Sequence, residues 1–270
     1  MTRVQWVVGA LGAILVAGAA YAKGSLSGSG MLAAILMGTI YYGAGNAFWF
    51  GILLVFFITS SALSRWRADA KAALEEAYDK TGRRDAGQVM ANGGIGMVLC
   101  LAYWLWPDPV WIWLFVGAMA TVTADTWATE IGSLSQKPPR SVLTGRIMPT
   151  GASGGVSLLG TLAAAAGGAL IGLSAWGLAA LSGMEDVRPV PALLAGLAGG
   201  LAGAFADSLL GASVQRMNRC AVCGREVESA AHCGQPTLYH RGWRWMNNDA
   251  VNIISSAAGA GAALLIGWFL

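Results

Sequence analysis

Apolar stretches separated by short polar segments dominate the pattern of this chain. A stretch of about 17–25 apolar residues is long enough for an α-helix to cross the hydrocarbon core of a bilayer. Eight such stretches are present, and the second is the weakest because Gly38, Gly43 and Gly45 interrupt it. The predicted spans are about 4–22, 26–43, 46–63, 89–106, 109–131, 153–181, 190–213 and 249–269. We therefore expect an all-α, polytopic membrane helix bundle of about eight spans, forming one integral membrane domain over residues 1–270.

Basic residues are concentrated in the loops that eight spans would place on one side of the membrane. These loops are 23–25, 64–88, 132–152 and 214–248. They contain 15 of the 17 Lys and Arg residues, and only Arg3 and Arg188 lie on the other side. Cytoplasmic loops carry such an excess of positive charge. We therefore expect these loops in the cytoplasm and both termini outside, as in a protein of a prokaryotic inner membrane.

The first apolar stretch has a second interpretation. Arg3, the apolar run and Ala20-Tyr21-Ala22 resemble a secretory signal peptide with its small-residue cleavage site. Cleavage would leave seven spans and would place the basic loops outside the cell, against the charge distribution. Eight spans therefore stay the prediction.

Composition agrees with a membrane protein. Hydrophobic residues make up 56% of the chain and charged residues only 11%, with a mean hydropathy of +0.57. A soluble domain would carry roughly 25% charged residues. The net charge is +3, and no basic run with interleaved aromatic residues is present, so nothing supports nucleic-acid binding. We expect membrane lipid as a partner, and the sequence predicts no oligomeric state.

Two predicted spans each carry small residues at four-residue steps around an aspartate. Residues at this spacing lie on one side of a helix, so each set forms a stripe. The stripes are Gly117, Thr121, Asp125, Thr129 and Gly199, Gly203, Asp207, Gly211. Small residues permit close helix contact. The following spans also begin alike, with ASGGVSLLGTLAAAAGG and NDAVNIISSAAGAGAA. The pattern predicts three parallel-repeated helical hairpins, from spans 3–4, 5–6 and 7–8. The alternative is that Ala/Gly-rich helices look alike by chance.

Acidic residues lie near the predicted cytoplasmic ends of two spans. An ionisable residue inside a membrane helix is costly and indicates function, which singles out Asp125 and Asp207. Together they could hold Mg²⁺ through oxygen ligands. Glu130 lies about 140° around the helix from Asp125, so the two share no face unless the helix end unwinds. The alternative role for each carboxylate is helix capping or a hydrogen bond between helices.

A glycine-rich segment, Pro149-Thr150-Gly151-Ala152-Ser153-Gly154-Gly155, stands at the predicted start of the sixth span. Helix N-termini present unpaired N–H groups to anions, and glycine lets an anion approach the backbone. The segment is a candidate phosphate cradle, through Thr150, Gly151, Ser153, Gly154 and Gly155. It is no P-loop, because no Gly-Lys-Ser/Thr follows. Lys137 and Arg140 in the preceding loop could neutralise phosphate, although membrane topology and lipid headgroups explain them equally well.

Amide side chains open two of the predicted spans. Asn248 is a natural N-cap and Asp249 complements the helix dipole, so capping alone could explain both residues. Asn252 lies one turn deeper, which favours a polar site. Asn92, near the start of the fourth span, lines up with Ser153 of the sixth span, and a looser alignment pairs it with Asp249 of the eighth.

Both histidines and three of the four cysteines lie within 21 residues of the loop 214–248. Their pattern is Cys220-x2-Cys223-x8-His232-Cys233-x6-His240. A cytoplasmic loop is kept reduced, so structural Zn²⁺ is favoured over a disulfide. The three cysteines with one of the two histidines would complete a tetrahedral site. A redox Cys-x-x-Cys or ordinary loop cysteines are the alternatives.

The charged segment 64–88 predicts an amphipathic helix on the cytoplasmic surface. Lys71 and Glu75, like Glu76 and Lys80, stand one helical turn apart. We expect this segment to set orientation and to contact lipid.

Four ordered motifs resemble one known family: ADTWATEIGSLS, PTGASGGVSLLGT, ADSLLGASVQ and NNDAVNIISS. They are similar to the domain-of-unknown-function-92 family of integral membrane proteins, which includes animal transmembrane protein nineteen and plant phytyl-phosphate kinase. The resemblance covers about residues 88–256. It implies phosphoryl transfer from a nucleoside triphosphate, CTP or another, to a prenyl (phytyl-like) monophosphate, giving the diphosphate.

Under this hypothesis we infer roles for the candidate residues, although the resemblance itself transfers no individual catalytic residue. Asp125, Glu130, Asp207 and Asp249 would be catalytic, with Mg²⁺ held by Asp125 and Asp207. The residues that would bind substrate or phosphate are Asn92, Lys137, Arg140, Thr150, Gly151, Ser153, Gly154, Gly155, Asn248 and Asn252. The alternatives are a transporter or translocase of a phosphorylated lipid, and another phospholipid-headgroup transferase.

Overall fold

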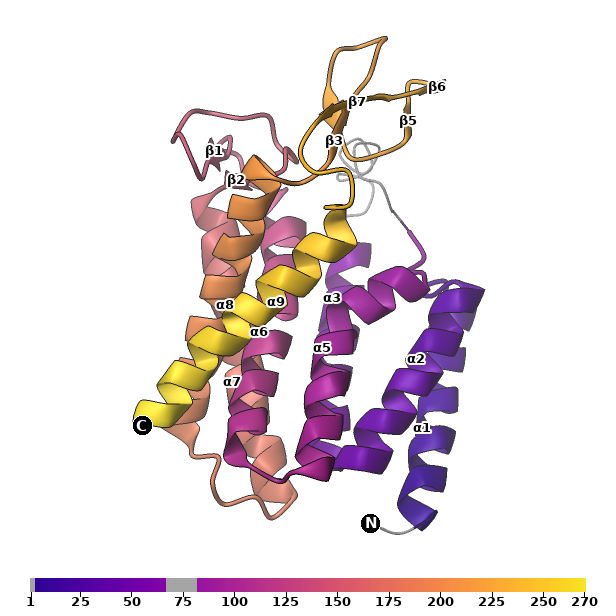
Figure 1. The fold of residues 1–270 in the computed structure, drawn as a ribbon, viewed down its shortest axis with the longest axis vertical. Coiled ribbons are helices and arrows are strands. Elements are labelled where there is room, and N and C mark those ends of the chain that lie inside the picture. The colour runs from indigo at the N-terminus through magenta and orange to yellow at the C-terminus, as the bar shows by residue number, and fades with distance from the viewer. Residues whose placement is uncertain (1–2, 67–81) are drawn as a thin grey trace.

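The computed structural model describes residues 3–66 and 82–270 and shows a bundle of long helices with folded loops at one end (Figure 1). The helices are α1 (Arg3–Ala22), α2 (Gly28–Ile40), α3 (Ala47–Arg65), α5 (Ala86–Leu105), α6 (Pro109–Gly132), α7 (Leu158–Leu181), α8 (Pro189–Ser213) and α9 (Asn248–Phe269). Every predicted span overlaps one of these helices over most of its length. The all-α, polytopic fold is confirmed, and the chain is an integral membrane protein with several spans.

Seven of the described helices are long and apolar enough to cross a membrane, and α2, with 13 residues, is not among them. It continues into a π-helical turn, η1 (Tyr41–Gly45). Aromatic rings lie against the glycines of this turn: a Cβ on Gly43 would come within 2.4 Å of the Trp6 ring, and one on Gly45 within 2.7 Å of the Trp49 ring. The weakness expected at these glycines is therefore a local change of helix type.

The small-residue stripes of α6 and α8 meet in the centre of the bundle. A Cβ on Gly199 would lie 2.8 Å from the Cα of Gly117. One turn further, the Thr121 hydroxyl donates to the Gly199 carbonyl at 3.1 Å. A Cβ on Gly203 would lie 2.1 Å from the hydroxyl of Thr121. Such stripes permit close helix contact, and here the two stripes contact each other.

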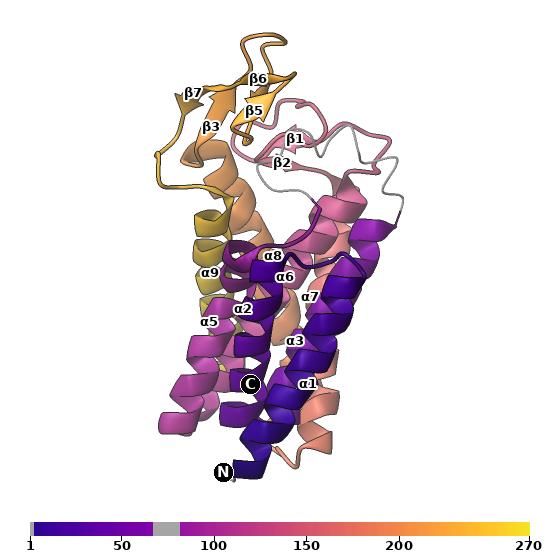
Figure 2. The ribbon, with the colours of Figure 1, turned by 90° about the vertical axis from the view of Figure 1, so that its right-hand side faces the viewer.

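The hairpins α3–α5, α6–α7 and α8–α9 share one orientation (Figures 1 and 2). The first helix of each runs toward the folded loops and the second runs away from them, while α1 begins and α9 ends at the opposite end. This is the arrangement expected of parallel repeats. It brings the equivalent Asp125 and Asp207 to the same end of the bundle.

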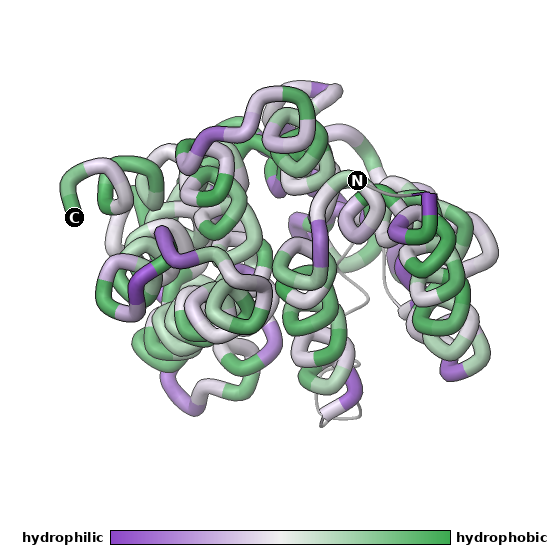
Figure 3. Tube along the Cα trace, turned by 90° about the horizontal axis from the view of Figure 1, so that it is seen from below, coloured by the Kyte–Doolittle hydropathy of each residue, from purple (hydrophilic) through white to green (hydrophobic). Residues whose placement is uncertain are grey.

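The outer surface of the bundle is apolar. Leu11 and Leu15 on α1 and Leu162 on α7 are exposed by 57%, 73% and 59%. Figure 3, which views the bundle from the end opposite the strands, shows hydrophobic residues along the helical parts of the trace. Such a surface would be costly in water and is suited to lipid.

Short strands fold the loops, although the sequence patterns indicated none. The strands are β1 (Arg140–Ser141), β2 (Gly155–Val156), β3 (Met217–Arg219), β4 (Glu226–Val227), β5 (Ala231–His232), β6 (Gln235–Pro236) and β7 (Leu238–Arg241). β1 pairs with β2, β5 pairs with β6, and the remaining three form a sheet in the order β4-β3-β7, all antiparallel. We call residues 217–241 the β-module.

The predicted surface helix falls largely outside the described residues. Its pairs Lys71–Glu75 and Glu76–Lys80 lie within 67–81, of which nothing is described. The end of the segment is ordered against the α1–α2 loop: the Arg84 N–H donates to the Ser25 carbonyl and the Ser27 N–H donates to the Arg84 carbonyl, both at 3.0 Å. These bonds fix Arg84 at the loop end of the bundle.

Candidate active site

A polar cavity of about 560 Å³ lies where the helices meet the folded loops. Twelve of the residues predicted for the site line it: Asn92, Asp125, Glu130, Thr150, Gly151, Ser153, Gly154, Gly155, Asp207, Asn248, Asp249 and Asn252. They come from α5, α6, α8, α9 and the loop before α7. The fold thus gathers residues that are up to 160 positions apart in the sequence.

Asp125 and Asp207 occupy equivalent places on α6 and α8. Each lies one turn beyond the stripe contact of Thr121 with Gly203, where the two helices give way to the cavity. Asp207 accepts a 3.5 Å hydrogen bond from the Ser255 hydroxyl. Its carboxylate also interacts electrostatically with Asp125 and with Glu228. Several carboxylates around one polar space form the type of oxygen-rich site that binds a divalent cation.

Glu130 lines the same cavity from another side of α6. The helix stays regular to Gly132, so the end does not unwind. Thr126, Ala128 and Thr129 also line the cavity, which therefore surrounds more than one face of this helix end. Glu130 accepts a 2.6 Å hydrogen bond from the Ser64 hydroxyl and so connects α6 to the end of α3.

The cavity is also lined by two arginines, Arg65 and Arg84, which the sequence patterns did not assign to the site. Arg84 is half-buried and donates to the Ser61 hydroxyl at 3.0 Å. Burial lowers the pKa of its guanidinium, and the negative charge of Glu130 acts in the opposite direction. Arg65, at the end of α3, donates to the Lys23 carbonyl at 2.6 Å and the Ser25 hydroxyl at 2.7 Å.

Lys137 and Arg140, the predicted phosphate cations, do not line this cavity. Arg140 belongs to β1, and its guanidinium donates to the Gly145 carbonyl at 2.9 Å, which folds it over its own turn. Lys137 is exposed just before β1. Positive charge at the cavity comes from Arg65 and Arg84 among the described residues.

The glycine-rich segment is a loop and does not form the first turn of a helix, which corrects the prediction. α7 begins at Leu158, with Ser157 as N-cap accepting from the Gly160 N–H at 3.1 Å. The residues before it turn sharply, and Gly154 has a φ of 82°. A Cβ on Gly154 would lie 2.5 Å from Ala212 of α8, so glycine allows this close approach. The start of α7 still borders the cavity, through Ser157, Gly160 and Thr161.

The start of α9 corrects a second detail. Asn247, and not Asn248, is the N-cap, since its side chain accepts from the Ala250 N–H at 3.0 Å. Asn248 is therefore not needed for capping, and it lines the cavity with Asp249 and Asn252. Asn92 lies across the cavity on α5, with its amide donating to the Gln88 carbonyl at 2.8 Å.

The β-module contributes to the cavity through Glu228, another residue missed from the sequence. The Ser153 hydroxyl donates to Gln215 at 2.6 Å, and the Gln215 amide donates to Glu228 at 2.9 Å. This chain of hydrogen bonds joins the glycine-rich loop, the end of α8 and the β-module. All three residues line the cavity.

An apolar cleft of about 70 Å³ adjoins the polar cavity. It lies among α1, α2, α3 and α5, with side chains such as Ala17, Leu26, Ala34, Met37, Phe50 and Phe57 along its walls. Arg84, Gln88 and Asn92 line both the cleft and the cavity. Polar and apolar spaces therefore share one wall.

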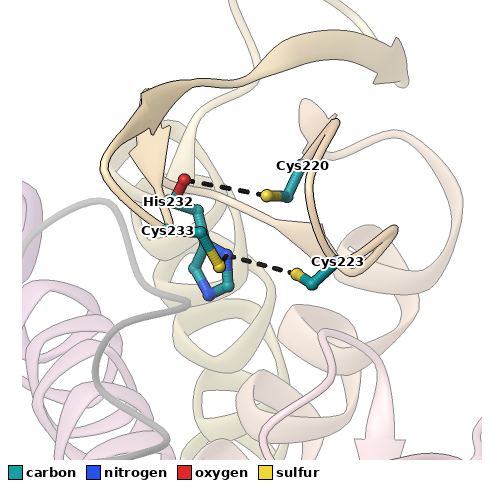
Figure 4. A group of neighbouring side chains, drawn as sticks. All are labelled: Cys220, Cys223, His232 and Cys233. Atoms are coloured by element: carbon teal, nitrogen blue, oxygen red, sulfur yellow. Dashed lines mark hydrogen bonds between the residues drawn. The ribbon is translucent and has the colours of Figure 1, made fainter.

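Four of the five predicted zinc ligands come together in the β-module (Figure 4). One ligand atom from each of Cys220, Cys223, His232 and Cys233 lies within 4.8 Å of the others. His240 lies outside this group and pairs with Glu226 at 3.2 Å. The sequence offered either histidine as the fourth ligand, and His232 is the one that lies with the three cysteines.

Comparison with known proteins gives one consistent result. The family model described as "Integral membrane protein DUF92" matches residues 11–260. The chain is 34% identical to Protein PGR of Arabidopsis thaliana over 261 residues, covering 89% of this chain and 88% of that protein. It is 27% identical to Protein VTE6, chloroplastic, of the same plant, covering 95% and 70%.

A relative from an archaeon is also similar. The uncharacterized membrane protein MJ0933 of Methanocaldococcus jannaschii is 32% identical over 194 residues, covering 71% of this chain and 75% of that protein. No solved structure matches the chain significantly.

Proposed function

This chain belongs to the DUF92 family of integral membrane proteins, and we propose that it is a membrane kinase that phosphorylates a prenyl (phytyl-like) monophosphate to the diphosphate. The observation that carries the proposal is the shared wall of the polar cavity and the apolar cleft. A lipid monophosphate has the matching chemistry, with a charged head and an apolar chain. The family resemblance adds the prenyl substrate and the nucleoside triphosphate.

The head of the lipid would bind at Arg84, the cation that belongs to both spaces. Guanidinium groups bind phosphate oxygens through charge-assisted hydrogen bonds. The prenyl tail of the lipid would enter the cleft. The cleft follows α3 from Phe57 to Phe50, a length of about 10 Å at 1.5 Å per residue. The cleft holds only part of a prenyl chain, so the rest would lie in lipid between helices.

The nucleotide would occupy the opposite side of the cavity. There the loop from Thr150 to Gly155 and the start of α7 offer backbone N–H groups and hydroxyls suited to phosphate. Asp125 and Asp207 would hold Mg²⁺, with Glu130 and Asp249 completing the acidic set. Bound Mg²⁺ neutralises the charge of a transferring phosphoryl group. The protein's own part is to position the acceptor phosphate in line with the γ-phosphate of the nucleotide, and direct transfer between them needs no covalent intermediate on the protein.

We place the cavity on the cytoplasmic side, because the loops around it carry most of the basic residues and nucleotides are cytoplasmic. A transporter is the weaker alternative. Transport sites lie near the middle of the membrane, whereas the residues around this cavity belong to the loop end of the helices.

The test is a product assay. The protein, purified in detergent, is incubated with phytyl or geranylgeranyl monophosphate, Mg²⁺ and each nucleoside triphosphate in turn. We expect the lipid diphosphate and one nucleoside diphosphate per turnover. Release of pyrophosphate would instead indicate nucleotidyl transfer to the lipid phosphate. Absence of turnover across the whole panel would overturn the proposal.

A further inference from the structure

The side chains of the β-module cluster are spaced as metal ligands are. The Nδ1 atom of His232 lies 3.2 Å from the Cys233 sulfur and 3.4 Å from the Cys223 sulfur. Around a tetrahedral Zn²⁺, bonds of about 2.3 Å to sulfur and 2.0–2.1 Å to nitrogen put neighbouring ligand atoms roughly 3.5 Å apart. Figure 4 shows the four side chains converging from two turns of the chain.

The two turns are built alike. The Gly224 N–H donates to the Cys220 carbonyl at 3.0 Å, closing a turn that carries Cys220 and Cys223. The β5–β6 turn carries His232 and Cys233. Both turns end in a glycine of positive φ, Gly224 at 73° and Gly234 at 72°.

Cys233 itself has a φ of 53°, and among the described residues no other non-glycine has a positive φ. The left-handed conformation is strained for a residue with a Cβ. In the β-module this conformation directs the thiol toward the other three ligands. A bond from this thiol to a metal ion would compensate for the strained backbone.

His232 is buried, its Nδ1 faces the thiols of Cys223 and Cys233, and its Nε2 has no hydrogen-bond partner among the described residues. Few apolar residues of the β-module are buried with it, chiefly Met217 and Val227, while Val222 and Leu238 are 63% and 66% exposed. So small a folded unit lacks the core to hold its own shape and commonly depends on a metal ion.

We propose that Cys220, Cys223, His232 and Cys233 bind one structural Zn²⁺, which holds the β-module in the shape that presents Glu228 to the cavity. Glu228 follows β4, and the Asn218 amide of β3 donates to the carbonyls of Glu228 and Ser229, both at 3.1 Å. Four protein ligands leave no open position, as in structural zinc sites. The link to turnover rests on the proposed kinase function, whereas zinc binding does not.

The first test is metal analysis of the full-length protein purified in detergent under reducing conditions. We expect about one zinc ion per chain, as one tetrahedral site requires. Cys223→Ser and Cys233→Ser should lose it, and His240→Gln, the matched control outside the cluster, should keep it. The proposal fails if the wild-type protein holds no zinc and takes up none from added Zn²⁺.

A cysteine variant that does not fold would also lose zinc, so the wild-type protein provides a second measurement. A zinc-selective chelator should expose three thiols to a thiol reagent, and added Zn²⁺ should protect them again. Thiols that react equally with and without chelator would overturn the proposal.

The part played by Glu228 is tested separately. Glu228→Gln should keep its zinc and lose turnover, and chelated wild-type protein should lose turnover by about tenfold or more, as expected when a site residue is displaced. Full turnover without zinc would show that the ion does not position Glu228. If the untreated wild-type protein shows no turnover, the kinase proposal fails, and the result of the zinc measurements is unaffected.

Discussion

Helices α1 to α5 and helices α6 to α9 border the same cavity with different kinds of side chain. The first group contributes Arg65, Arg84 and the apolar cleft. The second group, with its loops, contributes Asp125, Asp207 and the glycine-rich segment. One half is therefore suited to the head and chain of a lipid phosphate, and the other to a metal ion and a nucleotide.

The two halves are also packed differently. Aromatic rings pack together in the first half, where the Trp49 and Tyr103 ring centroids lie 5.4 Å apart and those of Phe48 and Trp49 lie 5.8 Å apart. In the second half, glycines bring the backbones of α6 and α8 into direct contact. Backbones in contact hold their carboxylates at a set separation, whereas the apolar cleft of the first half is bordered by side chains such as Phe50 and Phe57.

The largest effect is expected in the acidic half. Asp125→Asn and Asp207→Asn should each reduce turnover on the order of 10²–10³-fold, because charge stabilisation of the transferring group is lost. The measurement is diphosphate formation at saturating substrates. Asp186→Asn, an exposed aspartate between α7 and α8, is the control. Full activity in both cavity variants would show that the site is misplaced.

The next effect separates the halves by substrate. Arg84→Gln removes a charge-assisted hydrogen bond worth about 1.5–3 kcal/mol, so kcat/KM for the lipid monophosphate should fall roughly 10–100-fold. KM for the nucleotide should change little, because Arg84 lies on the cleft side. Arg83→Gln, its exposed neighbour, is the control. An effect on nucleotide KM alone would reverse the assignment of the two halves.

Packing of the second half is tested by Gly199→Ala. The new methyl would lie 2.8 Å from the Gly117 backbone, and overpacking of this kind costs about 1–3 kcal/mol of unfolding free energy. The apparent Tm in detergent should therefore fall. Gly177→Ala, on α7 with no atom within 4 Å of the added Cβ, should leave Tm unchanged or raised. Equal Tm values for both variants would contradict the close α6–α8 contact.

The smallest effect is expected in the cleft. Ala34→Phe fills part of the cleft and should reduce kcat/KM for a long prenyl monophosphate by about tenfold. The kcat/KM for a short-chain analogue should stay unchanged. Leu32→Phe, on the lipid-exposed side of α2, is the control. If Ala34→Phe treats both chain lengths alike, the prenyl chain does not occupy the cleft.

Long apolar stretches predicted the helices, because a segment that crosses lipid must pair its backbone polar groups within a helix and present apolar side chains to the bilayer. The stripe around Asp125 recurs around Asp207, so their meeting was predictable once the hairpins were taken as parallel. Asn92 was found in the same way, from the alignment of the spans, and Asn252 from its position one turn inside the eighth span. The bounds of α7 were less predictable, because Gly154 and Gly155 are as apolar as the helix that follows.

The missed residues carried no such pattern. Arg65 and Arg84 stand in a segment rich in Lys and Arg, where positive charge has a sufficient explanation in topology. What distinguishes Arg84 is its backbone pairing with Ser25 and Ser27, a contact between distant segments. Glu228 reaches the cavity only because short strands fold the loop back toward α8, and strands of two residues have no readable alternation.

The wall formed by Arg84, Gln88 and Asn92 separates two approaches to one reaction centre. In the proposed kinase, a lipid would arrive from the bilayer phase along the helices, and a nucleotide would arrive from the aqueous phase through the loops. The two routes would not cross, so both reactants would be present together and the phosphoryl group would pass directly between them. A single chain placed at this boundary would thereby join the chemistry of two solvents without releasing an intermediate into either.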